Sequence, residues 1–89
     1  MVSVKEQTLV LYEINCYPNP AQDVIYIEDK KQIPFSAVLY DILGNDMGVK
    51  AISKGERLSL RTTGIRDGLY FIRISVKDQV VMKKVLIRH

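Results

Sequence analysis

The chain has one cysteine, one histidine and no tryptophan among its 89 residues. The lone thiol of Cys16 cannot form a disulfide within the chain, and it cannot supply a metal site built from several thiolates. We expect it to act as a small buried hydrophobic residue. The histidine, His89, is the last residue, where we expect mobility, and no Gly-x-Ser-x-Gly motif accompanies it. These absences argue against a hydrolase triad of nucleophile, base and orienting group.

Long apolar runs are also missing. The unbroken apolar stretches cover only a few residues, whereas a membrane-spanning helix needs about 20. Residues 1–6 lack the basic start and apolar middle of a secretory signal. We therefore expect no membrane span, and we expect the chain to be part of a longer protein that brings its own export signal.

Patterns for cofactors and nucleic acids do not occur either. The five glycines lack the spacing of a phosphate-binding loop, and the acidic residues do not form a calcium-binding loop. The net charge is +3, but acids and bases mostly alternate along the chain until Asp78. No zinc-finger or RNA-binding signature accompanies the later basic residues. We expect no cofactor, no metal and no nucleic-acid partner.

What the chain does contain is a series of strand-like segments. With 47% hydrophobic and 26% charged residues, it has the composition of one small globular domain. Residues of high β-propensity recur between turn-forming Gly, Pro, Asn and Asp, and helical periodicity is not sustained anywhere. Short strands in this number predict an antiparallel sandwich or a small barrel. The seven predicted strands cover residues 8–12, 24–28, 35–41, 48–52, 57–60, 70–77 and 80–87.

Alternation within these strands predicts their positions. Both faces of residues 35–41 are largely apolar, which indicates a central strand, and residues 53–56 suit a hairpin turn. Lys83 and Lys84 interrupt the alternation of the last strand, so we expect a bulge or an edge position there. The core is predicted from the best period-two apolar positions, which are Ile25, Ile27, Leu39, Tyr70, Ile72, Ile74 and Val85.

Polar and aromatic residues near the turns are candidates for chemical roles. Because aspartates beside turns usually accept hydrogen bonds from nearby backbone amides, we expect a structural role rather than catalysis for Asp23, Asp41, Asp46 and Asp67. We expect the rings of Tyr40 and Tyr70 to pack in the core or at its rim. For Tyr17, beside its prolines, rim packing and a ligand platform are both open.

Three motifs stand in a fixed order along the chain. They are Tyr-Pro-Asn-Pro followed by an aspartate, Asp-x-x-Gly after an apolar strand, and Gly-x-Tyr opening a late strand. Their residues are Tyr17, Pro18, Asn19, Pro20, Asp23, Asp41, Gly44, Gly68 and Tyr70. Together they resemble the C-terminal sorting domain, type A, of the type IX (Por) secretion system, over about residues 16–87. The chain departs from the family pattern at Arg61, where an acidic residue is common, and at Asn45, where a basic one is usual.

The resemblance implies an immunoglobulin-like antiparallel β-sandwich that is an address and not an enzyme. It assigns residues 16–89 to the sorting domain and leaves residues 1–15 as an upstream segment that carries the first strand. The implied cargo belongs to a Gram-negative bacterium of the Bacteroidetes type. It would cross the periplasm and be recognised by the outer-membrane translocon, and a surface sortase-like protease would then remove the domain.

For translocon recognition, we favour the end of the chain on physical grounds, because an edge strand followed by unbalanced positive charge can dock by strand addition and charge. The predicted residues are Lys83, Lys84, Val85, Leu86, Ile87 and Arg88. The oligomeric state stays open, and exchange of the terminal hairpin would allow a dimer.

Two other functions remain as alternatives. One is an immunoglobulin-like adhesion or interaction module that stays attached to the end of a surface protein. The other is a carbohydrate-binding sandwich, which needs an exposed aromatic platform.

Overall fold

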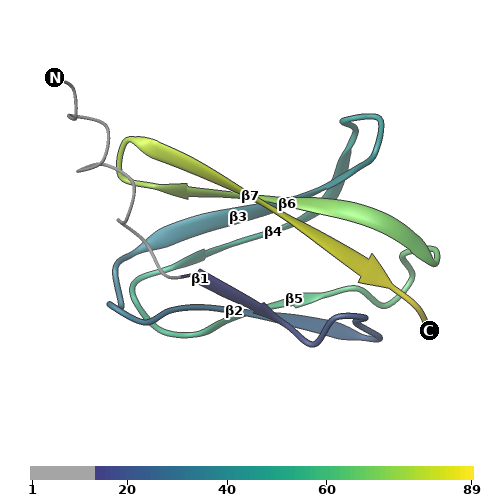
Figure 1. Ribbon diagram of the computed structural model, residues 1–89, viewed down its shortest axis with the longest axis horizontal. Coiled ribbons are helices and arrows are strands. Elements are labelled where there is room, and N and C mark those ends of the chain that lie inside the picture. The colour runs from purple at the N-terminus through teal and green to yellow at the C-terminus, as the bar shows by residue number, and fades with distance from the viewer. Residues whose placement is uncertain (1–13) are drawn as a thin grey trace, which may run out of the picture.

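The computed structural model describes residues 14–89 as two antiparallel β-sheets packed face to face (Figure 1). The smaller sheet has the strand order β1–β2–β5, formed by Ile14–Tyr17, Val24–Asp29 and Leu58–Arg61. The larger sheet has the order β4–β3–β6–β7, formed by Asp46–Ser53, Phe35–Asp41, Gly68–Val76 and Gln79–Ile87. No helix within these residues is long and apolar enough to cross a membrane. The predicted all-β sandwich is confirmed.

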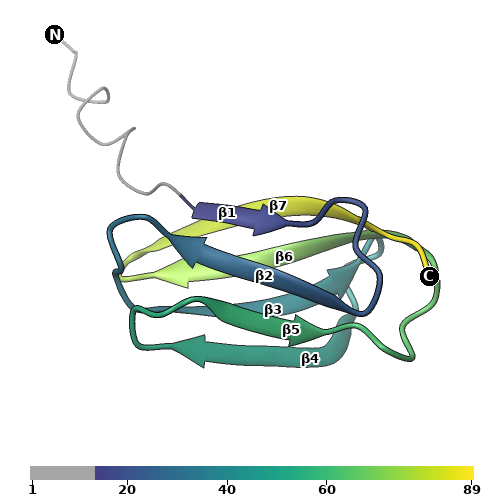
Figure 2. The same cartoon turned by 90° about the horizontal axis from the view of Figure 1, so that it is seen from below.

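Seen from below, β2 and β5 of the smaller sheet lie in front of β6 and β3 of the larger sheet (Figure 2). In constant-type immunoglobulin domains the fourth strand joins the first sheet. Here β4 pairs with β3 instead, so the sheets hold three and four strands. The hydroxyl of Tyr70 donates a hydrogen bond to the carbonyl of Arg66 at 2.7 Å, a contact typical of the tyrosine corner in such sandwiches.

The core lies between the sheets and follows the predicted alternation. The residues predicted for it are all at most 6% exposed: Ile25, Ile27, Leu39, Tyr70, Ile72, Ile74 and Val85. Phe35, Val76 and Ile87 extend the core toward the strand ends. The predicted central position of β3 is also confirmed, since it lies between β4 and β6.

The first described strand, β1, was not predicted and covers Ile14–Tyr17. The predicted strand at residues 8–12 lies outside the described residues. The β1 segment has only one large aliphatic side chain, Ile14, so its alternation is too weak to be recognised. Its strand character comes from pairing with β2, in which Ile14 lies opposite Asp29.

The segment at residues 53–56 is not a hairpin turn, because β4 and β5 belong to different sheets. The Ser53 hydroxyl donates to the carbonyl of Glu56 at 2.6 Å and accepts from the amide of Gly55 at 2.9 Å. Such local bonds close a reversal equally well within one sheet or between two. Gly55 has a φ of +122°, and a Cβ there would lie 2.6 Å from the carbonyl oxygen of Gln32, so only glycine fits.

The last strand is an edge strand, as predicted, but it carries no bulge. Its register with β6 is continuous from Gly68 opposite Ile87 to Val76 opposite Gln79. The two lysines therefore alternate like any other residues of a strand, and point to opposite faces. Lys83 is half-buried on the inner side, where its alkyl chain can pack while the amine reaches water. The register shift in this sheet lies between Val38 and Tyr40 instead, where β3 pairs with β4.

Candidate functional site

The motif residues and the end of β7 gather at one end of the sandwich, which we call the motif end. It holds the β1–β2 connection, the β3–β4 turn, the β5–β6 connection and the last residue (Figure 1). Asp41 lies opposite Tyr70 on the neighbouring strand, and Tyr70 lies opposite Val85. Three motifs far apart in the sequence thus meet beside the terminal strand.

The segment after Tyr-Pro-Asn-Pro pairs with the end of β7. The amide of Ala21 donates to the carbonyl of Leu86, and the amide of Arg88 donates to the carbonyl of Ala21, both at 2.8 Å. Ala21 forms a parallel bridge with Ile87, and the Asn19 side chain accepts from the amide of Leu86 at 3.0 Å. Ala21 is fully buried, and it was not among the predicted residues. The first motif and the predicted recognition strand are therefore one structural unit.

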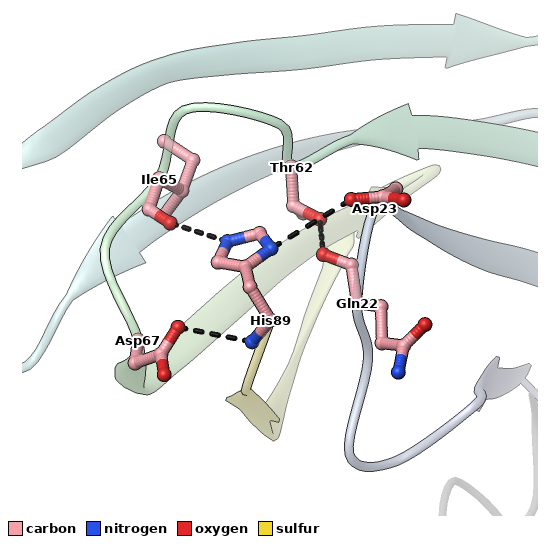
Figure 3. A network of polar contacts seen from close by, with 6 residues as sticks. All are labelled: Gln22, Asp23, Thr62, Ile65, Asp67 and His89. Atoms are coloured by element: carbon pink, nitrogen blue, oxygen red, sulfur yellow. Dashed lines mark hydrogen bonds and ion pairs between the residues drawn. The ribbon is translucent and has the colours of Figure 1, made fainter.

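His89 is anchored, contrary to the predicted mobility (Figure 3). Its Nε2–H donates to the carbonyl of Ile65 at 2.6 Å, and its backbone amide donates to Asp67 Oδ1 at 3.0 Å. Its Nδ1 lies 3.7 Å from Asp23 Oδ1. The three partners come from two distant segments, so position in the sequence alone misled the prediction. They hold the end of the chain against the β5–β6 connection.

Thr62 joins this network and was also missed by the sequence reasoning (Figure 3). It is fully buried, with its hydroxyl donating to the carbonyl of Gln22 and its amide donating to the carbonyl of Asp23, both at 2.8 Å. A buried threonine just after a strand carries no signal of its own in the sequence. Here it ties the end of β5 to the segment that pairs with β7.

The Asp-x-x-Gly motif forms the β3–β4 turn. The carboxylate of Asp41 accepts from the amides of Leu43 at 2.9 Å and Asn45 at 2.8 Å, and from the side-chain amide of Asn45 at 3.0 Å. These bonds, those of Asn45 above all, hold the pKa of Asp41 below its usual value. Gly44 has a φ of +88°, which favours glycine. The structural role predicted for Asp41 is confirmed, and Asn45, a departure from the family pattern, closes the turn.

The predicted recognition residues do not share one environment. Val85 and Ile87 are buried in the core, whereas Lys84 and Arg88 are exposed and Leu86 is half-buried. Only the exposed and half-buried members can touch a partner while the domain stays folded.

Lys83 belongs to a different place, beside Cys16. Burial raises the pKa of the Cys16 thiol to about 11, and the nearby charge of Lys83 opposes this rise. The thiol is therefore protonated near neutral pH, which makes it a poor nucleophile. Cys16 packs against the core from a partly buried position, close to its expected role.

Tyr70, Tyr40 and Tyr17 differ in how deeply they are buried and in what they contact. Tyr70 is buried as predicted, whereas Tyr40 is half-buried on the outer face of the larger sheet. The Tyr17 hydroxyl donates to Glu28 at 3.0 Å, and its ring lies 5.7 Å from the ring of Tyr26. These contacts favour rim packing for Tyr17 over a ligand platform.

Within residues 14–89, no group of three His, Cys, Asp or Glu side chains is arranged to hold a metal ion.

Comparison with known proteins relates the chain to a family and to a curated enzyme. A family model described as a secretion system C-terminal sorting domain matches residues 15–88. An endo-acting ulvan lyase from Formosa agariphila is 30% identical over 87 residues, which is 97% of this chain. The match covers only 17% of that protein, so the chain corresponds to a small part of it.

Proposed function

We propose that the outer-membrane translocon recognises the β7 edge of this chain, which belongs to the secretion system C-terminal sorting domain family. Domains of this family are sorting signals for type IX secretion, which carries proteins of Bacteroidetes to the cell surface or beyond. Such a signal is not itself catalytic, and it engages the secretion machinery. The machinery must therefore read an exposed part of the folded domain, and β7 lies at an edge of the larger sheet.

The backbone of β7 carries the proposal. In an antiparallel pair, alternate residues direct their amide and carbonyl groups toward the partner strand and away from it. The outward groups of Leu86 and the amide of Arg88 bond to residues 19–21. The outward groups of Val80, Met82 and Lys84 have no hydrogen-bond partner in the part of the chain that the structure describes. An extended segment of the translocon can pair with this open stretch by strand addition.

The side chains along the same strand supply charge. After Asp78 the charged residues are Lys83, Lys84 and Arg88, and no acid follows. Lys84 and Arg88 are exposed, so they support attraction to an acidic partner. Val85 and Ile87 act indirectly, by fixing the strand to the core.

The proposed course of events makes the chain a ligand and then a substrate, never an enzyme. The cargo enters the periplasm through a signal elsewhere in the full-length protein, and the translocon then binds this domain. A surface sortase-like protease removes it afterwards. We place the boundary with the upstream segment near residue 16; the start of β1 at Ile14 and of the family match at residue 15 support this.

A proline scan of the two edges of the larger sheet tests the proposal. The chain is fused behind a reporter with a periplasmic signal and expressed in a bacterium that has type IX secretion. Met82→Pro removes an outward amide of β7, and Ile52→Pro does the same on the β4 edge, since edge strands tolerate proline there. We expect Met82→Pro to hold the reporter in the periplasm and Ile52→Pro to be exported. Circular dichroism and melting temperature establish that both variants fold.

Lysine variants test the charge contribution. Lys84→Ala is expected to reduce export more than Lys83→Ala, because only Lys84 is exposed on the outer face.

Normal export of a folded Met82→Pro variant would contradict strand addition at β7. A reporter that is exported but keeps the domain on the surface would favour the adhesion module instead.

A further inference from the structure

The exposed large hydrophobic residues lie on one side of the molecule. Within residues 14–89 they all belong to the larger sheet or to the turn between β3 and β4, and they are Ile42, Leu43, Ile52, Leu69, Val80 and Met82. Over the same range, the smaller sheet contributes none of them. Exposed apolar groups gathered on one face mark an interaction surface more often than scattered ones do.

The β3–β4 turn holds two of these side chains in a fixed position. Ile42 is 62% exposed and Leu43 is 82% exposed, although they follow a buried strand directly. The bonds that Asp41 accepts from Leu43 and Asn45 close the turn beneath them. A rigid turn that presents adjacent aliphatic side chains loses little conformational entropy when a partner buries them.

A hollow of about 440 Å³ lies next to this turn. Its lining includes Ile42 of the turn and Tyr40, Phe71, Arg73 and Met82 from three neighbouring strands. Tyr40 lies opposite Phe71, and Arg73 lies opposite Met82. The hollow therefore combines aromatic and thioether groups with one cation, Arg73, and one carboxylate, Asp41.

The charges on this face are mostly of one sign. The strand register places the side chains of Lys50, Arg73 and Lys84 on the outer face. Two carboxylates lie near them, Asp46 at the start of β4 and Asp41, whose oxygens already accept bonds from amides of the turn. No ion pair joins these three cations to an acid within residues 14–89. A partner that covers the face must supply negative charge, or leave the cations without compensation.

We propose that Ile42, Leu43 and the adjoining hollow form a docking surface for an apolar pocket rimmed by carboxylates on a protein of the translocon. This inference rests on the proposed function and adds a second contact beside the β7 edge. The turn inserts Ile42 and Leu43 into the pocket, and Arg73 with Lys50 faces the acidic rim. Binding by a few buried anchors surrounded by charge is common at protein interfaces.

The same charges disfavour self-association, because a second copy of the chain docked through this face would bring one mostly positive surface against another.

The test measures binding of the full 89-residue chain to purified type IX translocon in detergent, by biolayer interferometry. Ile42→Ser with Leu43→Ser is expected to weaken binding at least about tenfold. The matched control, Ile52→Ser, removes an isoleucine that is 75% exposed on the same sheet but does not line the hollow, and it should bind like the wild type. Both variants are checked for an unchanged melting temperature.

The charge contribution is tested with paired cations. Lys50→Gln with Arg73→Gln should weaken binding several-fold at about 0.05 M salt. The wild type should lose affinity as the salt concentration is raised to about 0.5 M, and the double variant should lose less. Lys30→Gln with Arg61→Gln removes two exposed cations elsewhere and should keep the wild-type salt dependence.

The outcomes separate the two proposals. A wild-type chain that does not bind the translocon overturns both of them. Wild-type binding that Met82→Pro abolishes but Ile42→Ser with Leu43→Ser leaves unchanged overturns the docking surface and keeps the β7 edge. If the chain bound vesicles containing phosphatidylglycerol and lost this binding on Ile42→Ser with Leu43→Ser, the surface would belong to a membrane contact. If sedimentation showed a dimer that these changes dissociate, the surface would serve self-association. Either result would overturn the inference.

Discussion

The two outer faces of this sandwich are built on the same core but treat their polar groups in opposite ways. On the smaller sheet, the guanidinium of Arg57 lies 4.4 Å above the ring of Tyr26 and the Tyr17 hydroxyl bonds to Glu28. On the larger sheet, Arg73 and Lys84 lie among exposed apolar side chains with no acid paired to them in residues 14–89. Near the smaller sheet, Arg57, Tyr17 and Glu28 thus bond to groups of that sheet, whereas Arg73 and Lys84 have no such contacts in the described residues.

Removing the end of β7 should unfold the domain and so disrupt both outer faces. Deletion of residues 85–89 takes away Val85 and Ile87, both buried, and the bonds between Ala21 and β7. We expect loss of the cooperative thermal transition, seen by circular dichroism, and retention of a fused cargo in the periplasm. Deleting His89 alone removes only its contacts with Ile65, Asp67 and Asp23 and should leave the fold intact. A truncated chain that still melts cooperatively would show that the strand end is dispensable.

Tyr70 is the next most sensitive position, because it supports both faces from the interior. Truncating a buried aromatic side chain costs about 3–5 kcal/mol, so Tyr70→Ala should lose that much stability in urea unfolding. Tyr70→Phe keeps the ring and removes the bond to Arg66, which should cost about 1 kcal/mol. Equal stability of Tyr70→Ala and the wild type would contradict its place in the core.

Local patterns in the sequence predicted most of this interior. The alternation of Tyr70, Ile72 and Ile74 is strong because one side of β6 is buried along its whole length. The order of strands within the sheets was less accessible, since the bonds around Ser53 look the same in a hairpin and in a crossing between sheets.

The motif end was only partly predictable for a related reason. Each motif was recognised by itself, but the contact of Ala21 with Leu86 and that of His89 with Ile65 join residues far apart in the chain. No local propensity encodes such pairs. The end of the strand at Asp41 was predicted, but the exposure of Ile42 and Leu43 was missed, because local sequence does not show whether an apolar pair within a turn packs on the core.

A pair of arginine variants sharpens the contrast between the faces. Arg57→Ala loses a cation–π contact and a 3.4 Å hydrogen bond to Tyr17, so we expect a small loss of stability, seen as a lower urea midpoint. Arg73→Ala should change stability by less than about 0.5 kcal/mol but reduce export of a fused reporter. Urea unfolding and the secreted fraction are measured for both. If Arg57→Ala impaired export and Arg73→Ala did not, the partner-binding face would be the smaller sheet.

The smallest effect concerns how acid acts on the β3–β4 turn. The pKa of Asp41 is lowered in the folded state, mainly by the amides of Asn45, so its bonds contribute stability above the unfolded value of about 3.9. That contribution is lost as the pH falls through the lower folded pKa. Amide hydrogen exchange of Leu43 and Asn45, corrected for intrinsic rates, should therefore accelerate only below about pH 4. Asp41→Ala should show fast exchange at neutral pH with the core amides of β6 still protected. If both amides were as well protected in Asp41→Ala as in the wild type, the carboxylate would not be what holds Ile42 and Leu43 in place.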